Sequence, residues 1–542
     1  MSATVRNKRD ARKKRFFQEG RRRIKKRLDN TPGSERSVPM MTARNIHYEH
    51  ADRVRGLSAG GIGAILLLAQ KIELDKEIDR TLHVLKRHLP YHESDHVLNI
   101  AFNILAGGKR IEHLELRRND EVYLDALGAE RIPDPTTAGD FCRRFTSEAE
   151  VVSLMNAINE ARLRVWTQQP KEFLDEAILD ADGTIVETDA ECKQGVDIGY
   201  NGKWGYHVHL VSLANTGEPL FLLNRSGNRP SQDRAGEYLN KGVALCVRAG
   251  FRKILLRGDT RIAENKDLDP WDEQVLPRDG TTIAETADLD SWDDAGNIRF
   301  IFGYAAYDVL KARADELPAQ AYSFLERPPR YMIKTSPRQQ PERVKPEIVR
   351  ERGFKTIHLL EEMVAEFNYQ PGACKKSYRM IVLRKRLATD QGQMRLFEEY
   401  RYFFYITNDR DMSAEDIVFS ANDRCNQENL IAQLKSGVHA LTTPVNDLVS
   451  NWAYMVMASL AWSLKAWSAL LVPVSPRHAA KHEAEKRTLL RMEFATYRAA
   501  FIEMPCQIVR GGRRLIYRML SWNPWQGVFL RLVERLHECW LC

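Results

Sequence analysis

The stretch Ala177-Ile178-Leu179-Asp180-Ala181-Asp182-Gly183-Thr184 is a short apolar run that carries two aspartates two residues apart. Alternate side chains of a β-strand share one face, so Asp180 and Asp182 would point the same way. Two neighbouring carboxylates on a buried strand repel each other and lose hydration, which costs free energy. A divalent metal ion would offset that cost, and the stretch therefore predicts a metal site.

The chain has 542 residues, which is enough for two to four domains and at least one sizeable core. Its apolar content of 43% and charged content of 28% are ordinary for a globular protein. The net charge of +8 permits a polyanionic partner without requiring one. The eight cysteines are scattered and the N-terminus has no apolar signal segment, so we expect a reducing, cytoplasmic compartment.

The first 27 residues contain 13 lysines and arginines and only two acidic residues, Asp10 and Glu19. Such a segment is either a solvated, disordered tail or an arm that contacts nucleic-acid phosphates and releases counterions. A polar linker follows at Asn30–Val38. We therefore expect residues 1–50 to form a basic arm and linker.

Residues 51–170 have a helical pattern, with apolar runs at Ala64–Ala69 and Val97–Leu105 that are too short to span a membrane. The Pro133–Thr137 segment is typical of a helix start, and the helix after it would hold Phe141 and Arg143. Short helices with basic residues between them form either a DNA-binding bundle or a plain packing domain. The pattern alone leaves both open.

Residues 171–310 alternate between predicted strands and helices, which indicates an α/β core. Strands at Trp204–Leu213 and Leu220–Leu223, joined by a turn at 215–217, would follow the acidic strand in antiparallel order. After a helix near Asp233–Ala249, the apolar strand that begins at Lys253 ends in Asp259. Strand ends are where α/β sheets place ligands, so Asp259 is a second candidate ligand.

Residues 311–400 read as a β-rich insertion. Its predicted strands are Tyr331–Lys334, Thr356–Leu359, Tyr378–Leu387 and Tyr400–Thr407. Just before it, Thr260–Glu273 resembles Thr281–Asp294. We interpret the second copy as a duplication in a loop, without chemistry and with solvated acidic residues.

The α/β core is expected to resume over residues 401–475. A helix capped by Ser413 precedes the segment Asp423–Lys435, which we predict to be a helix with Arg424, Glu428 and Lys435 on one face. The apolar segment Asn451–Val474 is predicted to be a buried helix covering the sheet, with a membrane span as the alternative. Residues 476–542 are predicted to form a basic, helical C-terminal region.

Three acidic residues far apart in sequence thus stand where they can meet: Asp182 in one strand, Asp259 at the end of another, and Glu428 on a helix. Metal-assisted phosphoryl transfer uses such carboxylates to hold two divalent ions about 4 Å apart. His207 and His209 share a strand face, but carboxylate-bound magnesium needs no imidazole, and we interpret them as ordinary strand histidines.

From about Leu57 to Leu470 the chain resembles the DDE transposases of bacterial insertion sequences, in the branch with a β-rich insertion before the glutamate. The matching motifs are Asp182-Gly183-Thr184, Arg257-Gly258-Asp259, and Arg424, Glu428 and Lys435 in the spacing of that branch's Tyr-Arg-Glu-Lys signature. Segments Phe403–Asn408 and Ile100–Arg110 are also similar. Ala421 stands where the signature has tyrosine. That departure affects one aromatic or phosphate contact and leaves the carboxylates intact.

The resemblance implies an RNase H-like mixed-sheet core with a helical N-terminal domain and a β-rich insertion. It implies a catalytic, metal-binding triad of Asp182, Asp259 and Glu428 holding two Mg²⁺ or Mn²⁺ ions, with Arg424 and Lys435 on DNA phosphates. Asp180 is the rival for the first ligand, and the Asp-x-Thr match favours Asp182. The implied reaction is strand cleavage and strand transfer on terminal inverted repeats and target DNA.

The resemblance further implies a homodimer on double-stranded DNA in the bacterial cytoplasm, at the nucleoid, and no membrane. Two rival functions remain. One is an RNase H-like nuclease that hydrolyses DNA without joining strands. The other is a catalytically dead DNA-binding protein derived from a transposase, whose carboxylates would tolerate substitution.

Overall fold

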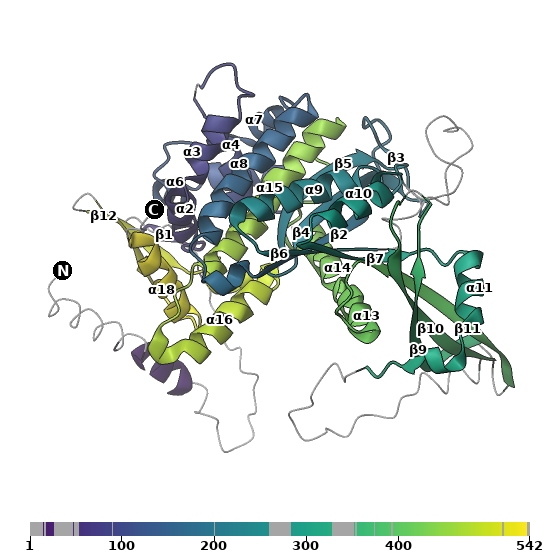
Figure 1. Cartoon of the computed structure of the whole chain (residues 1–542). Coiled ribbons are helices and arrows are strands. Elements are labelled where there is room, and N and C mark those ends of the chain that lie inside the picture. The colour runs from purple at the N-terminus through teal and green to yellow at the C-terminus, as the bar shows by residue number, and fades with distance from the viewer. Residues whose placement is uncertain are drawn as a thin grey trace. The chain divides into compact units, whose positions relative to one another are not determined.

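The structure is a computed structural model. It describes residues 15, 18–26, 47, 54–88, 90–199, 201–259, 283–327, 352, 355–372, 374–391, 394–511 and 514–538. The chain forms two compact units (Figure 1). The sheet unit comprises Gln169–Ala432 and Leu441–Trp452, and the helical unit comprises Met1–Gln168, Gln433–Ala440 and Ala453–Cys542. The predicted linker Asn30–Val38, the repeat copy Thr260–Glu273 and the strand Tyr331–Lys334 lie outside the described residues.

The sheet unit is built on a mixed sheet of ten strands. Its core strands are β2 (Glu176–Glu187), β4 (Trp204–Leu213), β5 (Glu218–Ser226), β6 (Lys253–Gly258) and β7 (Ile298–Tyr304). They lie in the order β5-β4-β2-β6-β7, with β2, β4 and β5 antiparallel and β6 and β7 parallel to β2. This is the strand order of an RNase H-like fold, as expected. The two-residue β3 (Asp197–Ile198) extends the edge beside β4.

Helices cover both faces of this core. On one face lie α9 (Ala235–Ala249) and α10 (Ile283–Asp294), and on the other α13 (Ala414–Asp423) and α14 (Cys425–Ala432) (Figure 1). Gly242 of α9 packs against Leu179 of β2, where an added Cβ would lie 3.2 Å from the leucine side chain. Since β2 alternates, the face opposite Leu179 carries Asp180 and Asp182 and receives α14.

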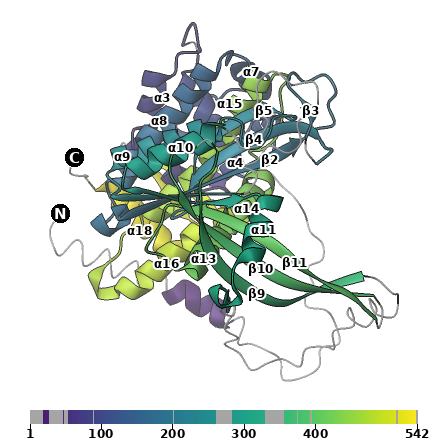
Figure 2. The same cartoon turned by 45° about the vertical axis from the view of Figure 1, so that its right-hand side comes forward.

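The β-rich insertion continues the same sheet instead of interrupting it. It consists of β8 (Ser323–Phe324), β9 (Lys355–Tyr369), β10 (Tyr378–Gln391) and β11 (Met394–Thr407), with α11 (Asp308–Glu316) before it. The long antiparallel strands β9, β10 and β11 form a ribbon (Figure 2). The last residues of β11, Phe404–Thr407, pair with Tyr304–Ile301 of β7. The insertion and the core therefore share one hydrogen-bonded sheet.

The second repeat copy, Thr281–Asp294, was expected to be a loop, and this was wrong, because most of it forms α10. Its acidic residues were expected to be solvated, which fits the exposed Asp294 but not Asp290. Asp290 accepts hydrogen bonds from the backbone nitrogens of Lys375 (2.7 Å) and Lys376 (3.3 Å) and from the Tyr378 hydroxyl (2.6 Å). The Lys376 ammonium in turn contacts Asp293 at 2.7 Å. These acidic residues thus fix the start of β10 against the core.

The helical unit contains the predicted helices of residues 51–170. They are α2 (Ile62–Lys71), α3 (Leu74–Thr81), α4 (Glu93–Leu105), α5 (Leu114–Arg118), α6 (Glu121–Leu127), α7 (Pro135–Cys142) and α8 (Glu148–Trp166). The start of α7 has the expected chemistry, because the Asp134 side chain accepts a hydrogen bond from the Thr137 nitrogen at 2.8 Å. Of the basic N-terminal arm, residues 18–26 are helical and Arg21–Lys26 are exposed.

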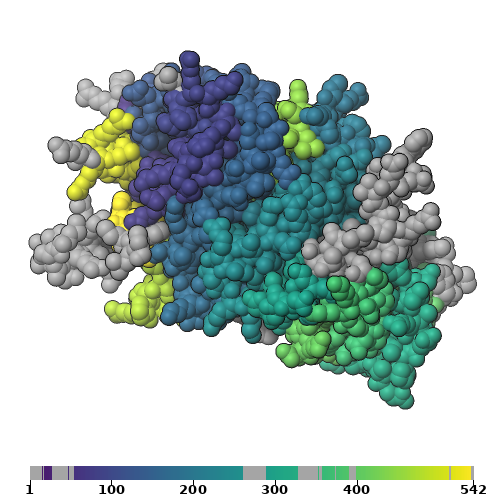
Figure 3. Space-filling view, turned by 45° about the horizontal axis from the view of Figure 1, so that its top comes forward, coloured from purple at the N-terminus to yellow at the C-terminus, as the bar shows by residue number. Residues whose placement is uncertain are grey.

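The C-terminal region was predicted to be helical, and this was wrong for residues 506–511 and 514–519. Helices α16 (Ala479–Arg491), α17 (Phe494–Tyr497) and α18 (Gln526–His537) are present, but β12 (Cys506–Gly511) and β13 (Arg514–Met519) form an antiparallel hairpin. The hairpin adds to β1 (Gly56–Leu57). The first four residues of β12 alternate between buried and half-buried, a two-residue period that is typical of a strand. Figure 3 shows the yellow C-terminal residues beside the purple N-terminal ones.

The apolar segment after Asn451 belongs to α15 (Leu448–Leu470), a helix buried along nearly its whole length. Two of its buried polar side chains, Ser463 and Lys465, have partners from other helices or loops. The Lys465 ammonium donates to the Leu490 carbonyl at 2.8 Å, and Arg162 donates to the Ser463 hydroxyl at 3.3 Å. Among the described helices, α15 included, none combines the length and the apolar character that crossing a membrane requires.

Candidate active site

The register of the sheet brings Asp182 next to Asp259. Strands β2 and β6 run parallel, with Asp180 opposite Arg257 and Ala181 opposite Gly258. The next residues along the two chains are Asp182 and Asp259, so the pairing itself sets the aspartates side by side. Glycine follows Asp182 for a steric reason, because a Cβ at Gly183 would lie 2.6 Å from Nε2 of His207.

The Arg424 guanidinium contacts all three predicted carboxylates. Its Nη1 lies 3.1 Å from Oδ2 of Asp182, and its Nη2 lies 3.5 Å from Oδ2 of Asp259 and 3.9 Å from Oε1 of Glu428. The structure thus brings together Asp182, Asp259, Glu428 and Arg424. The side chains of Arg424 and Asp182 are 11% and 18% exposed, whereas that of Glu428 is 63% exposed, so the cluster opens to solvent on the glutamate side.

Burial and charge act together on this cluster. Burial raises the pKa of Asp182 to about 6, an effect that Arg424 opposes and the charge of Asp259 reinforces. Burial lowers the pKa of Arg424, but the charges of Asp259, Asp182 and Glu428 outweigh it and the pKa is raised. The carboxylates therefore form a site that favours positive charge, and Arg424 supplies that charge.

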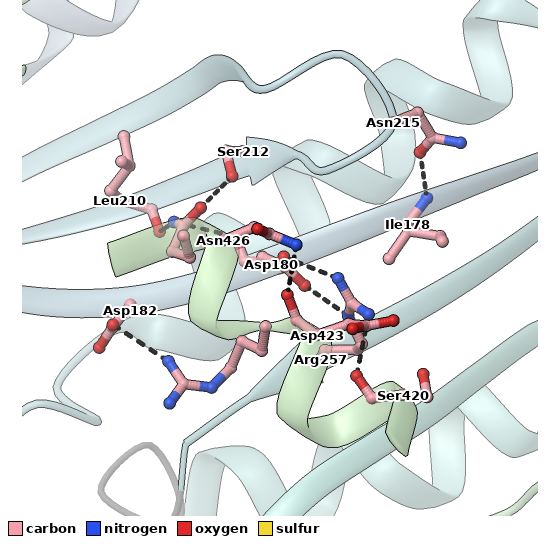
Figure 4. A network of polar contacts seen from close by, with 12 residues as sticks. Ile178, Asp180, Asp182, Leu210, Ser212, Asn215, Arg257, Ser420, Asp423 and Asn426 are labelled. Carbon is pink, nitrogen blue, oxygen red and sulfur yellow. Dashed lines mark hydrogen bonds and ion pairs between the residues drawn. The ribbon is translucent and has the colours of Figure 1, made fainter. Parts of the chain in front are cut away.

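Asp180, the rival for the first ligand, is fully engaged elsewhere. Its Oδ1 accepts from Nε of Arg257 at 2.7 Å and its Oδ2 from Nη2 at 2.9 Å (Figure 4). Both side chains are buried, with exposures of 1% and 5%. Burial raises the pKa of Asp180, while the bidentate guanidinium opposes that shift. Asp180 and Asp182 thus have different partners on one face of β2.

The segment Asp423–Lys435 is not the single helix that was predicted. Helix α13 ends at Asp423, α14 runs from Cys425 to Ala432, and Gln433–Gly437 forms a π-helical turn. Arg424 lies at the break, where its carbonyl accepts a hydrogen bond from the Gln427 nitrogen at 2.8 Å. Arg424 and Glu428 still meet because they are four residues apart. Lys435 lies in the π-helical turn and belongs to the helical unit.

Two other positions behave as packing residues. Ala421, at the signature's tyrosine position, packs against a core cluster that includes Leu255 and Ile417. On the opposite face of the sheet His209 is buried, and burial holds its pKa far below the ordinary value. Nδ1 of the buried His207 lies 2.6 Å from the Arg229 carbonyl oxygen. In the described part of the chain, no group of three His, Cys, Asp or Glu side chains is arranged to hold a metal ion as the side chains now stand.

Two buried residues beside this cluster, Gln427 and Arg257, were given no role from the sequence. The Gln427 amide is buried against β2 and β4. An arginine inside the apolar strand Lys253–Gly258 was a signal, because a buried cation needs a partner and Asp180 was an acid without one. For Gln427 the only indication in the sequence was its position, one residue before Glu428.

The sheet thus places two aspartates on adjacent strands and a glutamate on a neighbouring helix, a set of carboxylates of the kind that metal-assisted phosphoryl transfer uses. Residues 282–540 match the family described as "Transposase DDE domain group 1". This C-terminal part of the chain, slightly under half of its length, is similar to the DDE domain of transposases, and the match supports a transposase enzyme that acts on DNA. The match includes Arg424, Glu428 and Lys435, whereas Asp182 and Asp259 precede it.

No curated protein matches the chain. Among solved structures, the chain is similar to one titled as a cryo-EM structure of the piggyBac transposase synaptic complex with hairpin DNA. The sequence identity is 10%, the similarity covers 82% of this chain and 81% of that one, and the TM-score is 0.32. A TM-score this low does not define a fold, which here follows from the strand order itself.

Proposed function

We propose that this transposase cleaves and joins DNA strands with two divalent metal ions held by Asp182, Asp259 and Glu428. The observation that carries the proposal is the contact of all three carboxylates with the Arg424 guanidinium at 3.1–3.9 Å. A cluster that holds a monovalent cation between three acids has the charge and the oxygen donors that Mg²⁺ or Mn²⁺ requires.

Bound metal ions would supply Lewis-acid stabilisation of the attacking and leaving oxygens of the phosphodiester. The protein would hold the metal ions and orient the DNA phosphates. Asp182 and Asp259 are fixed by the β2–β6 pairing, and Glu428 is delivered by α14. Arg424 leaves the carboxylates to bind a DNA phosphate, and Lys435 binds a second phosphate. The products would be a free 3′ hydroxyl at the element end and its joint to target DNA.

The DNA partners are the terminal inverted repeats of an insertion sequence and a target duplex. The exposed basic helix 18–26 supports phosphate contacts by the N-terminal arm. The helical N-terminal region and the C-terminal region would supply further contacts. Because two element ends are joined, a homodimer on DNA is part of the proposal, as is action at the bacterial nucleoid.

The test uses duplexes that carry the terminal repeats flanking the protein's own gene. The wild type should cleave them with Mg²⁺ or Mn²⁺. Asp182→Asn, Asp259→Asn and Glu428→Gln should abolish cleavage while DNA binding is retained. Asp308→Asn, an exposed acid of α11, is the control and should be unaffected. An active Asp259→Asn enzyme would overturn the assignment.

Two rival functions are separated by the same assay. A pre-cut end with a 3′ hydroxyl should be joined to a second duplex, whereas a nuclease without strand transfer would only hydrolyse. A catalytically dead DNA-binding protein would bind the repeats and show no cleavage under any metal condition.

A further inference from the structure

We propose that Gln427 is the residue that orients Glu428 and Arg424 toward the two aspartates. This inference rests on the proposed function, because it concerns how the same carboxylates are brought to one place. It assigns a positioning role to Gln427 and makes the hydroxyl of Ser212 its partner.

The Gln427 side chain is buried, with 2% exposure, and makes three hydrogen bonds to the sheet. Its Nε2 donates to the carbonyls of Leu210 at 3.2 Å and Asp180 at 3.4 Å, and its Oε1 accepts from the Ser212 hydroxyl. Figure 4 shows the surroundings of these bonds. Leu210 and Ser212 lie on β4 and Asp180 on β2, so one amide joins the helix to both strands.

The orientation of α14 depends on these hydrogen bonds because the helix is short and is not continued as a regular α-helix at either end. It has eight residues, with a break at Arg424 before it and a π-helical turn after it. Its other buried side chains, Leu430 and Ile431, are apolar. Apolar contacts are non-directional and restrain rotation about the helix axis less than hydrogen bonds to fixed carbonyls do.

The rotation of α14 determines where the acid points. Successive helical residues are about 100° apart around the axis, since the helix has about 3.6 residues per turn. When Gln427 points into the sheet, Glu428 points along the sheet surface, on the side where Arg424 contacts Asp182 and Asp259. If the amide bonds were lost, the helix could turn and carry Glu428 away from the aspartates.

A further hydrogen bond holds α13 to the sheet and so helps to position Arg424. The Arg257 guanidinium, held by Asp180, donates from Nη1 to the Ser420 carbonyl at 2.9 Å. Ser420 lies in the last turn of α13, four residues before Arg424. Asp180 therefore takes part in both sets of hydrogen bonds, accepting from Gln427 with its carbonyl and from Arg257 with its carboxylate.

The experiment measures Mn²⁺ binding by calorimetry on the full chain, together with DNA affinity and thermal stability. Gln427→Met keeps the length of the side chain and removes all three hydrogen bonds. We expect it to weaken Mn²⁺ binding by about 10-fold to 100-fold, as is typical when a group that orients a metal ligand is lost. The Mn²⁺ concentration for half-maximal cleavage should rise in parallel, and excess Mn²⁺ should restore activity.

Asn426→Leu is the matched control. Asn426 is an exposed amide on the same helix whose side chain donates to the Asp423 carbonyl, and we expect wild-type Mn²⁺ binding. A purely structural role for Gln427 would lower thermal stability without changing the metal dependence. Wild-type Mn²⁺ affinity in Gln427→Met would overturn the proposal.

Ser212 keeps the test decisive if Gln427→Met does not fold. Ser212→Ala removes one of the three bonds and should weaken Mn²⁺ binding by several-fold, while Ser212→Thr retains the hydroxyl and should restore it. Unchanged binding in Ser212→Ala would contradict the orienting role. Asp182→Asn separates the two proposals, because unaltered Mn²⁺ binding in that variant would refute the metal site itself.

Discussion

The Arg424 guanidinium donates from Nη1 to Oδ2 of Asp182 at 3.1 Å, so an ion pair joins the helical segment after α13 to strand β2. The same guanidinium contacts Asp259 and Glu428, which lie on two other elements. One positive group thus balances three carboxylates that would otherwise repel one another.

Asp182→Asn should stabilise the metal-free protein above pH 6. Burial raises the pKa of Asp182 from 3.8 to about 6, so the folded protein binds this proton more tightly than the unfolded chain does. The ionised form therefore costs folding free energy. The shift corresponds to about 3 kcal/mol, and we expect a gain of about 2 kcal/mol because asparagine serves Arg424 less well.

The sign fixes the pH dependence. The gain should be full above pH 6 and should vanish below about pH 4, where Asp182 is protonated in both states. Urea unfolding with a chelator at pH 8 and pH 4 measures it. An equal effect of the substitution at both pH values would contradict the raised pKa.

Arg424→Gln should bind Mn²⁺ more tightly than the wild type in the absence of DNA. The guanidinium competes for the three carboxylates, and a unit charge 4 Å away contributes up to about 4 kcal/mol at an effective dielectric constant of 20. Because the arginine can swing out, we expect a gain of about fivefold to tenfold. DNA binding should weaken.

Calorimetry with and without a terminal-repeat duplex checks this prediction. In the wild type DNA should tighten Mn²⁺ binding by drawing Arg424 away, and Arg424→Gln should lose that dependence. Arg401→Gln, an exposed arginine paired with Glu399, is the control. Weaker Mn²⁺ binding in Arg424→Gln would show that the guanidinium assists the metal.

Asp180→Leu should destabilise the fold by about 3–5 kcal/mol, because it leaves the buried Arg257 guanidinium without its carboxylate. The double variant Asp180→Leu with Arg257→Met should recover part of that loss, since the unpaired charge is removed. Denaturant unfolding of both single variants and the double variant gives the coupling energy. Strictly additive losses would mean that the ion pair contributes nothing.

Asp290→Ala should loosen the turn between β9 and β10. It removes the acceptor for the nitrogens of Lys375 and Lys376 and for the Tyr378 hydroxyl, at a cost of about 1–3 kcal/mol. Hydrogen exchange should speed up at the start of β10 and stay unchanged in β4. Asp308→Ala on α11 serves as the control, and equal exchange in the two variants would argue against the anchor.

The sequence predicted the core sheet because its strands are continuous apolar runs bounded by turn residues, from the acidic strand β2 to β6 before Asp259. It also predicted that β5 would follow β4 through the turn at 215–217, which the structure confirms. Predicting that Asp182, Asp259 and Glu428 all contact Arg424 would have required two facts. One is the register of β2 against β6, and the other is the helix break at Arg424. Single-sequence periodicity carries neither.

The misread segments have physical causes. In residues 281–294 the acidic residues that suggested a solvated loop are acceptors for the insertion, a partner distant in sequence. In the C-terminal region the two-residue alternation covers only the first four residues of β12, and the partners of that strand are β13 and the distant β1. Gln427 gave no signal, because the groups that it binds are backbone carbonyls, which look alike in every sequence.

Strand β11 belongs to both the ribbon and the core sheet, which limits how the protein can be shortened. The whole of β11 pairs with β10, and its last four residues also pair with β7 of the core. The whole ribbon therefore cannot be deleted without removing a strand that pairs with the core. Deleting β11 would leave β7 as an unpaired edge strand, and exposed edge strands promote aggregation. It would also remove the residues that connect the sheet to α13. Shortened versions of this enzyme should keep residues 404–407 and join the chain further out along the ribbon.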